Sequence, residues 1–268
     1  MFTYLAAVNE NEIINHTGNL VVNGNVERGA IINVKNGGFV CHGNVLENVK
    51  IKINRNNDLS SVQIRFCCFS YTKFNGTNGY GTFGDTGGKI TIMGDISCNG
   101  IFESSQGIVV HGNIGPRNKF ISVSGAIKLI KGCDVQTQIS SVSGEIMLQK
   151  FLGENTVINS VSGDVILEYG NFPCHLAITS VSGDIVGQFI GENSEIESVS
   201  GDVIIEELHR NSTIKTTSGD ISVNRFTSPQ TEITSTSGSI YKGARHSVLD
   251  MPKHEGELPC AFKPNIRG

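Results

Sequence analysis

A short repeat in the second half of the chain limits its possible folds more than any other feature. The segment SVSGDVIL (Ser160–Leu167) has close copies at nearly constant intervals of about 19 residues. The corner glycines of these copies are Gly88, Gly107, Gly125, Gly144, Gly163, Gly183, Gly201, Gly219 and Gly238, and Gly18 and Gly37 precede them in the same spacing. A period near 19 is too short for a helical hairpin or a propeller blade and suits one coil of a β-solenoid.

Aliphatic residues recur at fixed offsets from the corner glycines. The position five residues before the glycine holds Phe120, Ile139, Ile158, Ile178, Ile196, Ile214 and Ile233. The second position after it holds Ile127, Ile146, Val165, Ile185, Val203, Ile221 and Ile240. The fourth position after it is also mostly aliphatic, and alternation with period two indicates strands whose second and fourth residues face inward.

These columns predict an all-β fold, a single-stranded parallel β-helix of about 12 coils of about 19 residues. Right-handed winding is expected because parallel crossovers are overwhelmingly right-handed, and the alternative is a left-handed coil, whose six-residue pattern is not visible. Residues 1–243 should form this solenoid, with residues 1–14 as an N-terminal cap. Residues 244–268 should form a C-terminal tail or cap.

One interval in the series is longer than the others. Gly37 and Gly88 are 51 residues apart, which corresponds to two turns and about 13 additional residues. A glycine-free corner at Asn56–Leu59 would supply the missing turn. The additional residues should lie in the glycine-rich loop Phe74–Gly88, where the glycines favour irregular structure.

The corner itself has a structural explanation. Glycine accepts the positive φ that a sharp bend between strands can require. Serine hydroxyls directly before the glycine and three residues before it can bond to backbone groups at the bend. The structural corners are therefore Gly125, Gly144, Gly163, Gly183, Gly201, Gly219 and Gly238.

The repeats resemble those of a known group of proteins. Residues 88–241, with SVSGDVIL, SVSGDIVG, SVSGDVII and TTSGDISV, are similar to the adhesin family of bacterial β-solenoids with Ser-Gly-Asp corners. This resemblance implies a solenoid with a role in surface adhesion. In the first half, GNLVVNGNV and GGFVCHGNV resemble the coils of bactofilin-like polymer-forming proteins, which implies a cytoskeletal rod as an alternative.

Acidic residues follow several corner glycines. Asp164, Asp184, Asp202 and Asp220 form a column that is a candidate cation site, because hard cations bind carboxylate oxygens. The simpler interpretation is that each aspartate accepts backbone hydrogen bonds at its turn and keeps its charge in water. We therefore expect neither a metal nor a cofactor.

Ionisable residues also allow an enzymatic alternative. A carbohydrate-active β-helix enzyme would need an acid and a base close together in a groove. The candidate pairs are Glu168 with Glu206 and Glu207, or His175 with His209. All of them lie in or near variable turn segments, where polar residues are expected anyway, so we do not expect an enzyme.

Histidines also precede two equivalent glycines, in VCHGNV and VVHGNI. His42 and His111 should lie several coils apart, so a joint metal site that includes Cys41 is not expected. The seven cysteines show no C-x-x-C spacing and are interpreted as free thiols in a reducing compartment.

An apolar column is the best candidate for a binding site. The third position after the corner glycine should face outward together with the acid column. Four consecutive members of this position are apolar, namely Met147, Ile166, Val186 and Ile204. A contiguous exposed stripe usually contacts something: the protein's own tail, a second copy or a partner protein.

The composition excludes several function classes. A net charge of −4 gives no basic surface for nucleic acid. No stretch approaches the ~20 apolar residues of a transmembrane helix, and the N-terminus lacks a signal-peptide pattern, so we expect no membrane insertion. Cytoplasmic localisation is the default expectation, with signal-less export as the alternative. The sequence favours a non-catalytic scaffold that contacts a protein or a glycan, or that associates with itself.

Overall fold

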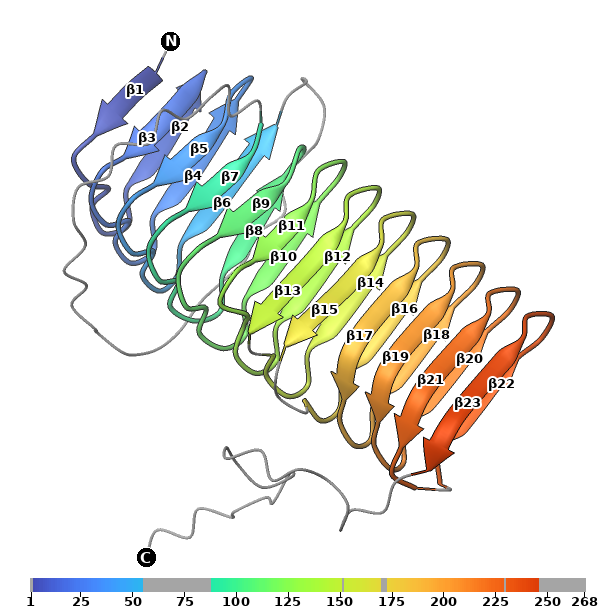
Figure 1. Cartoon of the computed structure of the whole chain (residues 1–268). Coiled ribbons are helices and arrows are strands. Elements are labelled where there is room, and N and C mark those ends of the chain that lie inside the picture. Colours follow the sequence, from blue (N-terminus) through green and yellow to red (C-terminus); the bar gives the residue numbers. More distant parts are fainter. Residues whose placement is uncertain (1, 55–87, 151, 170–172, 229, 246–268) are drawn as a thin grey trace, which may run out of the picture.

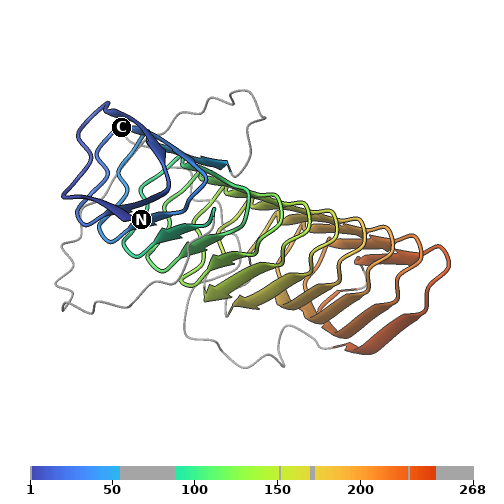
Figure 2. The ribbon, with the colours of Figure 1, turned by 90° about the horizontal axis from the view of Figure 1, so that it is seen from above.

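The chain forms an elongated parallel β-solenoid (Figures 1 and 2). The structure is a computed structural model that describes residues 2–54, 88–150, 152–169, 173–228 and 230–245. In these ranges the solenoid has about 11 turns of about 19 residues and no helix. The coils run in sequence order along the rod, and the N-terminal coil lies at one end and β23 at the other (Figure 1).

Each complete coil contributes one strand to each of two parallel sheets, and β23 is the last described strand. The 12-stranded sheet contains β1 (Phe2–Leu5), β3 (Asn19–Val22), β5 (Phe39–Cys41), β7 (Ile90–Ile92), β9 (Ile108–Val110), β11 (Ile127–Leu129), β13 (Ile146–Lys150), β15 (Val165–Tyr169), β17 (Ile185–Ile190), β19 (Val203–Leu208), β21 (Ile221–Phe226) and β23 (Ile240–Arg245). The 11-stranded sheet contains β2 (Ile13–Thr17), β4 (Ile31–Lys35), β6 (Lys50–Asn54), β8 (Ile101–Ser104), β10 (Lys119–Ser122), β12 (Gln138–Ser141), β14 (Val157–Ser160), β16 (Ala177–Ser180), β18 (Glu195–Ser198), β20 (Thr213–Thr216) and β22 (Glu232–Ser235).

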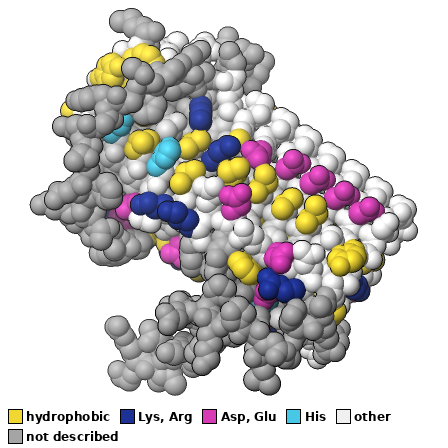
Figure 3. Space-filling model, viewed as in Figure 1, with side chains coloured by type: hydrophobic (Ala, Val, Ile, Leu, Met, Phe, Trp, Pro, Cys, Tyr) yellow, Lys and Arg dark blue, Asp and Glu magenta, His cyan; other side chains and the backbone are white. Residues whose placement is uncertain are grey.

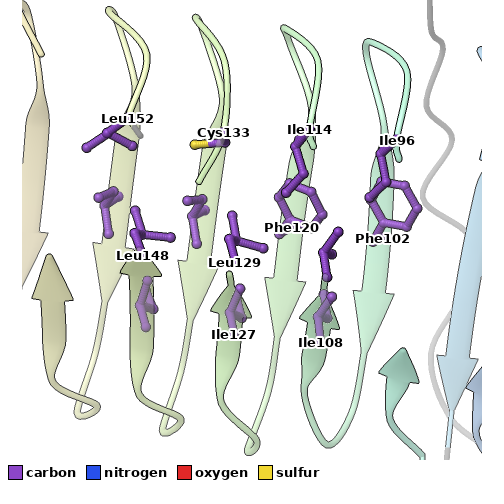
Figure 4. Packing of buried hydrophobic residues seen from close by; sticks show 14 of the residues in the cluster. Ile96, Phe102, Ile108, Ile114, Phe120, Ile127, Leu129, Cys133, Leu148 and Leu152 are labelled. Carbon is purple, nitrogen blue, oxygen red and sulfur yellow. The ribbon is translucent and has the colours of Figure 1, made fainter. Parts of the chain in front are cut away.

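The predicted aliphatic columns form the core between the two sheets. In β12 to β16, Ile139, Ile158 and Ile178 pair in register and are buried. Figure 4 shows side chains of successive coils stacked in the same way, including Phe102 and Phe120, whose rings stack with centroids 5.1 Å apart. Equivalent residues of neighbouring coils lie about 4.8 Å apart, so each side chain fills the space above its counterpart.

The additional turn expected between Gly37 and Gly88 is absent from the register. β5 pairs directly with β7, with Phe39 opposite Ile90, and β6 pairs directly with β8. A strand has only two edges, so the interval from Gly37 to Gly88 contains one turn rather than two. The predicted corner Asn56–Leu59 and the loop Phe74–Gly88, apart from Gly88 itself, lie outside the described residues.

The two ends of the solenoid also differ from the expectation in detail. Residues 1–14 were expected to cap the solenoid, but β1 and the start of β2 belong to its first coil, and β1 pairs with β3. At the other end β23 extends the solenoid to Arg245. The predicted tail is residues 244–268, and its residues 246–268 lie outside the described residues.

The corner glycines stack closely, but most do not need a positive φ. Gly88 and Gly107 have φ of 92° and 126°, whereas the corners from Gly125 onward have no positive φ. In those later coils a Cβ would overlap the backbone of the coil before it; at Gly163 it would collide with the carbonyl oxygen of Gly144. Glycine is therefore required here because the backbones of neighbouring coils stack closely. This corrects the expectation that a positive φ requires it.

The sequence analysis missed a column of residues whose backbone has the left-handed conformation. This column lies at the opposite corner, just before the second strand of each coil. Its members have φ between 54° and 64°: Asn11, Asn48, Asn99, Arg117, Gln136, Asn155, His175, Asn193 and Asn211. Asparagine adopts this conformation more readily than most residues. The recurrence of asparagine at intervals of one coil is the sequence signal that would have revealed this turn.

Candidate binding surface

The four apolar residues predicted to face outward lie side by side on the 12-stranded sheet. Met147, Ile166, Val186 and Ile204 occupy β13, β15, β17 and β19, and each is paired in register with the next. Val186 and Ile204 are 39% and 47% exposed, and the other two are half-buried. We call these four residues the outer apolar column.

The two residues that continue this column are polar or charged. Lys128 precedes Met147, and its Nζ atom lies 3.5 Å from a carboxylate oxygen of Glu145. Ser222 follows Ile204 on β21. The apolar column is therefore limited to four coils.

A row of acidic residues runs along one side of the column. Its members are Glu145, Asp164, Asp184, Asp202 and Asp220. The Oδ1 atom of each aspartate accepts a hydrogen bond from the backbone N–H of its counterpart on the next coil, as in Asp202 N–H to Asp184 at 2.8 Å. Figure 3 shows acidic side chains in a row beside hydrophobic ones. The aspartates thus accept backbone hydrogen bonds as expected, but from the next coil rather than from their own turn.

A second row of polar residues runs along the other side of the column. It contains Gln149, Glu168, Gln188, Glu206 and Asn224. Gln149 donates to Glu168 at 3.0 Å, and Asn224 donates to Glu206 at 2.6 Å. The apolar column therefore lies between two acid-bearing rows.

The sequence analysis missed a further exposed apolar row at the serine corners. The middle residue of each Ser-Val-Ser segment points outward, and its exposure is 44–50% in Val123, Val142, Val161, Val181 and Val199. The flanking serines bond to the backbone: Ser180 donates to the Gly183 carbonyl, and Ser182 donates to the Val161 carbonyl one coil before. The bend turns the residue between them toward solvent.

Charged side chains gather where β19 and β21 end. Glu207 is buried, and its carboxylate lies 3.3 Å from His209 Nε2 and 3.4 Å from the Arg225 guanidinium, which also contacts Glu206. Arg210 contacts the buried Glu192 at 2.8 Å. Burial lowers the pKa of His209 below its usual range, although Glu207 opposes this effect.

Only some of the candidate catalytic residues lie close together. Glu206, Glu207 and His209 share this cluster, whereas Glu168 lies two coils before Glu206 and bonds to Gln149. His175 occupies an exposed left-handed corner two coils from Asn211, the corresponding residue in the coil of His209. The acids of the cluster already contact arginine or histidine, so the arrangement is that of a structural ion-pair network.

The two histidines that precede glycines are closer than expected. His42, Met93 and His111 occupy equivalent positions on three successive coils, since each backbone N–H bonds to the coil before. They are therefore two coils apart rather than several, because β5 pairs directly with β7. Burial and nearby Lys89 lower the pKa of His111. Within the described residues no group of three or more His, Cys, Asp or Glu is arranged to hold a metal.

The cysteines agree with the expectation in part. Cys41, Cys98 and Cys133 are buried, Cys41 and Cys133 are free thiols, and burial raises the pKa of these two to about 12. Cys174 is disulfide-bonded, which corrects the expectation of free thiols throughout. In the parts of the chain that the structure describes, no helix is long and apolar enough to cross a membrane.

A comparison with known families matches the region of the acid-bearing corners. The model of the Toastrack DUF4097 family covers residues 94–251, more than half of the chain. None of the curated proteins and none of the solved structures matches the chain.

Proposed function

We propose that this chain, which belongs to the Toastrack DUF4097 family, is a non-catalytic β-solenoid scaffold that binds another protein through the outer apolar column. The exposure of Val186 and Ile204, next to Met147 and Ile166 in a continuous column, carries this proposal. Contiguous apolar residues on a surface are more often contact sites than isolated ones.

The backbone beneath the column supports a binding role. β15, β17 and β19 each have hydrogen-bonded neighbours on both sides, so the four side chains are presented by a continuous sheet. A surface held in one arrangement loses little conformational entropy on binding. The adhesion role implied by the Ser-Gly-Asp repeats is one form of such a function.

The ionisable residues support a scaffold more than an enzyme. A catalytic acid or base has to reach its substrate with a suitable protonation state. Glu207 is instead buried between His209 and Arg225, and Glu206 contacts Arg225 and Asn224. These contacts stabilise the junction of neighbouring coils.

Site-specific photocrosslinking in the native cell tests the proposal. A photoreactive amino acid at Val186 should yield a defined crosslinked protein, and adding Ile204→Asp should abolish that product. The control places the same group at Asn159, an exposed residue of β14 on the other sheet. Equal crosslinking at both positions, or a product insensitive to Ile204→Asp, would refute binding through the column.

A further inference from the structure

We propose that the outer apolar column accepts a basic amphipathic helix of the partner protein. This inference rests on the proposed binding function and names the chemistry of the partner. It follows from the charge on both sides of the column and from the spacing of its side chains.

Negative charge flanks the column on both sides. Glu145 and Glu206 have cationic partners, Lys128 and Arg225 respectively. Among the ion pairs found in the described residues, no cation contacts the other five acids, Asp164, Glu168, Asp184, Asp202 and Asp220. The aspartates bond only to backbone amides of the next coil, which leaves their negative charge uncompensated. Lysine and arginine side chains are therefore the complementary groups.

The same charges disfavour a second copy of this chain as the occupant. Suppose that the columns of two copies packed face to face. The aspartate row of one copy would then lie opposite either the aspartate row of the other copy or its second polar row, which carries Glu168 and Glu206. Both arrangements bring carboxylates together, and like charges across an interface are costly. A partner with positive flanks avoids this cost.

The spacing of the column selects a helix rather than a strand. Successive residues of the column are one coil apart, about 4.8 Å, so four of them span about 14 Å. Helix residues i, i+3, i+7 and i+10 cover about 15 Å along one face. Alternate residues of an extended segment are about 6.8 Å apart and lose register with the coils after one step. A helix parallel to the solenoid axis can thus contact all four side chains.

The width of the surface also fits a helix. The aspartate row lies two residues along the strand from the apolar column, about 6.8 Å away. The second polar row, which carries Glu168 and Glu206, lies equally far on the other side. A helix with its side chains is about 10–12 Å across. Long basic side chains on its two flanks would therefore reach both rows.

A synthetic peptide provides the test. The probe is a fluorescein-labelled amphipathic helix of leucine and lysine, titrated with the full chain at low salt and followed by fluorescence anisotropy. We expect saturable binding that weakens with added salt, because the acids are exposed. A leucine and glutamate helix of the same pattern should not bind.

Two pairs of variants locate the binding site. Val186→Ser with Ile204→Ser should weaken binding of the leucine and lysine helix about tenfold, since apolar contacts are lost. Asp184→Asn with Asp202→Asn should weaken it and reduce its salt dependence. The matched controls are Val181→Ser with Val199→Ser, equally exposed valines at the corner, and Glu195→Gln with Glu197→Gln, exposed acids of the other sheet. Both controls should leave binding unchanged.

The outcomes separate this inference from the proposed function. No binding of the leucine and lysine helix, equal binding of its glutamate counterpart, or equal effects of test and control variants would overturn the basic-helix inference. If crosslinking at Val186 persisted in that case, the scaffold function would stand with another partner chemistry. Circular dichroism and melting temperature confirm that each variant is folded.

Discussion

The Oδ1 atom of Asp184 accepts a hydrogen bond from the backbone N–H of Asp202, 2.8 Å away on the next coil. The same bond joins Asp164 to Asp184 and Asp202 to Asp220. Each aspartate thus satisfies a backbone donor that lies just outside the strand ladder. This places a structural requirement on residues that also give the surface its charge.

Replacing Asp184 separates these two roles. Asp184→Ala removes the acceptor for the Asp202 amide and should lower the free energy of unfolding by about 0.5–1.5 kcal/mol. Asp184→Asn keeps an acceptor oxygen and should cost less. Urea denaturation followed by circular dichroism measures both. Identical losses for the alanine and asparagine variants would show that the hydrogen bond does not contribute.

The aspartate row should not bind calcium tightly. Calcium takes six to eight oxygen ligands, whereas each aspartate here uses one oxygen on a backbone amide and projects into solvent. We expect isothermal titration calorimetry to detect no binding tighter than about 1 mM. Micromolar affinity that disappears in Asp184→Asn would make the row a cation site.

Gly163 should not tolerate a side chain. A Cβ at this position would collide with the carbonyl oxygen of Gly144, so Gly163→Ala should destabilise the protein by about 1–3 kcal/mol, as overpacking does. Val161→Ala, two residues earlier and exposed, should change stability by less than about 0.5 kcal/mol. Thermal denaturation of the two variants tests the difference, and equal midpoints would contradict close stacking as the reason for glycine.

The buried hydroxyl groups three residues before the corner glycines should contribute to stability. The Oγ atom of Ser180 donates to the Gly183 carbonyl at 2.7 Å, and Ser180 is fully buried. Ser180→Ala should cost about 1–3 kcal/mol, because the carbonyl loses its partner. Ser180→Thr should retain most of the stability, since Thr216 makes the same bond to Gly219 at 2.7 Å. A stable alanine variant in chemical denaturation would argue against this requirement.

His209 should make stability depend on pH. Burial holds its pKa in the folded protein below its usual value of about 6.5, so the unfolded chain binds a proton more readily. The stabilisation is present above pH 6.5 or so and is lost as the pH falls through the folded pKa. His209→Gln should therefore reduce the loss of stability between about pH 7.5 and 5.5.

The exposed His175 serves as the control for that measurement. His175→Asn preserves a side chain suited to its left-handed corner, where φ is 55°, and shows what the loss of an exposed histidine does to the melting temperature at each pH. If both histidine variants changed the profile equally, burial of His209 would not be the cause.

The repeated positions could be predicted from the sequence because each coil meets the same environment as its neighbours. A strand side chain faces either the core or solvent, so the period of two placed Ile139 and Ile158 inside and Val186 and Ile204 outside. The outer apolar column was predicted in this way. Because the same alternation recurs in every coil, the inward and outward assignments do not depend on any single residue.

Other features depend on contacts between coils that a single coil does not reveal. The need for glycine at Gly163 comes from the carbonyl of Gly144, which only the stacking distance brings near. The ion-pair cluster of Glu207, His209 and Arg225 joins side chains from two coils at a turn of irregular length. Periodicity does not predict the side-chain geometry at such a turn.

The number of coils also depends partly on the sequence and partly on the tertiary structure. The sequence by itself determined a solenoid with a period near 19, because core residues recur at fixed offsets from a glycine corner. It did not determine that Gly37 and Gly88, 51 positions apart, belong to successive coils, which only the tertiary structure decided through the pairing of β5 with β7. The physical reason is that spacing records how many residues separate two corners, whereas the number of turns depends on which strand edges form hydrogen bonds with each other.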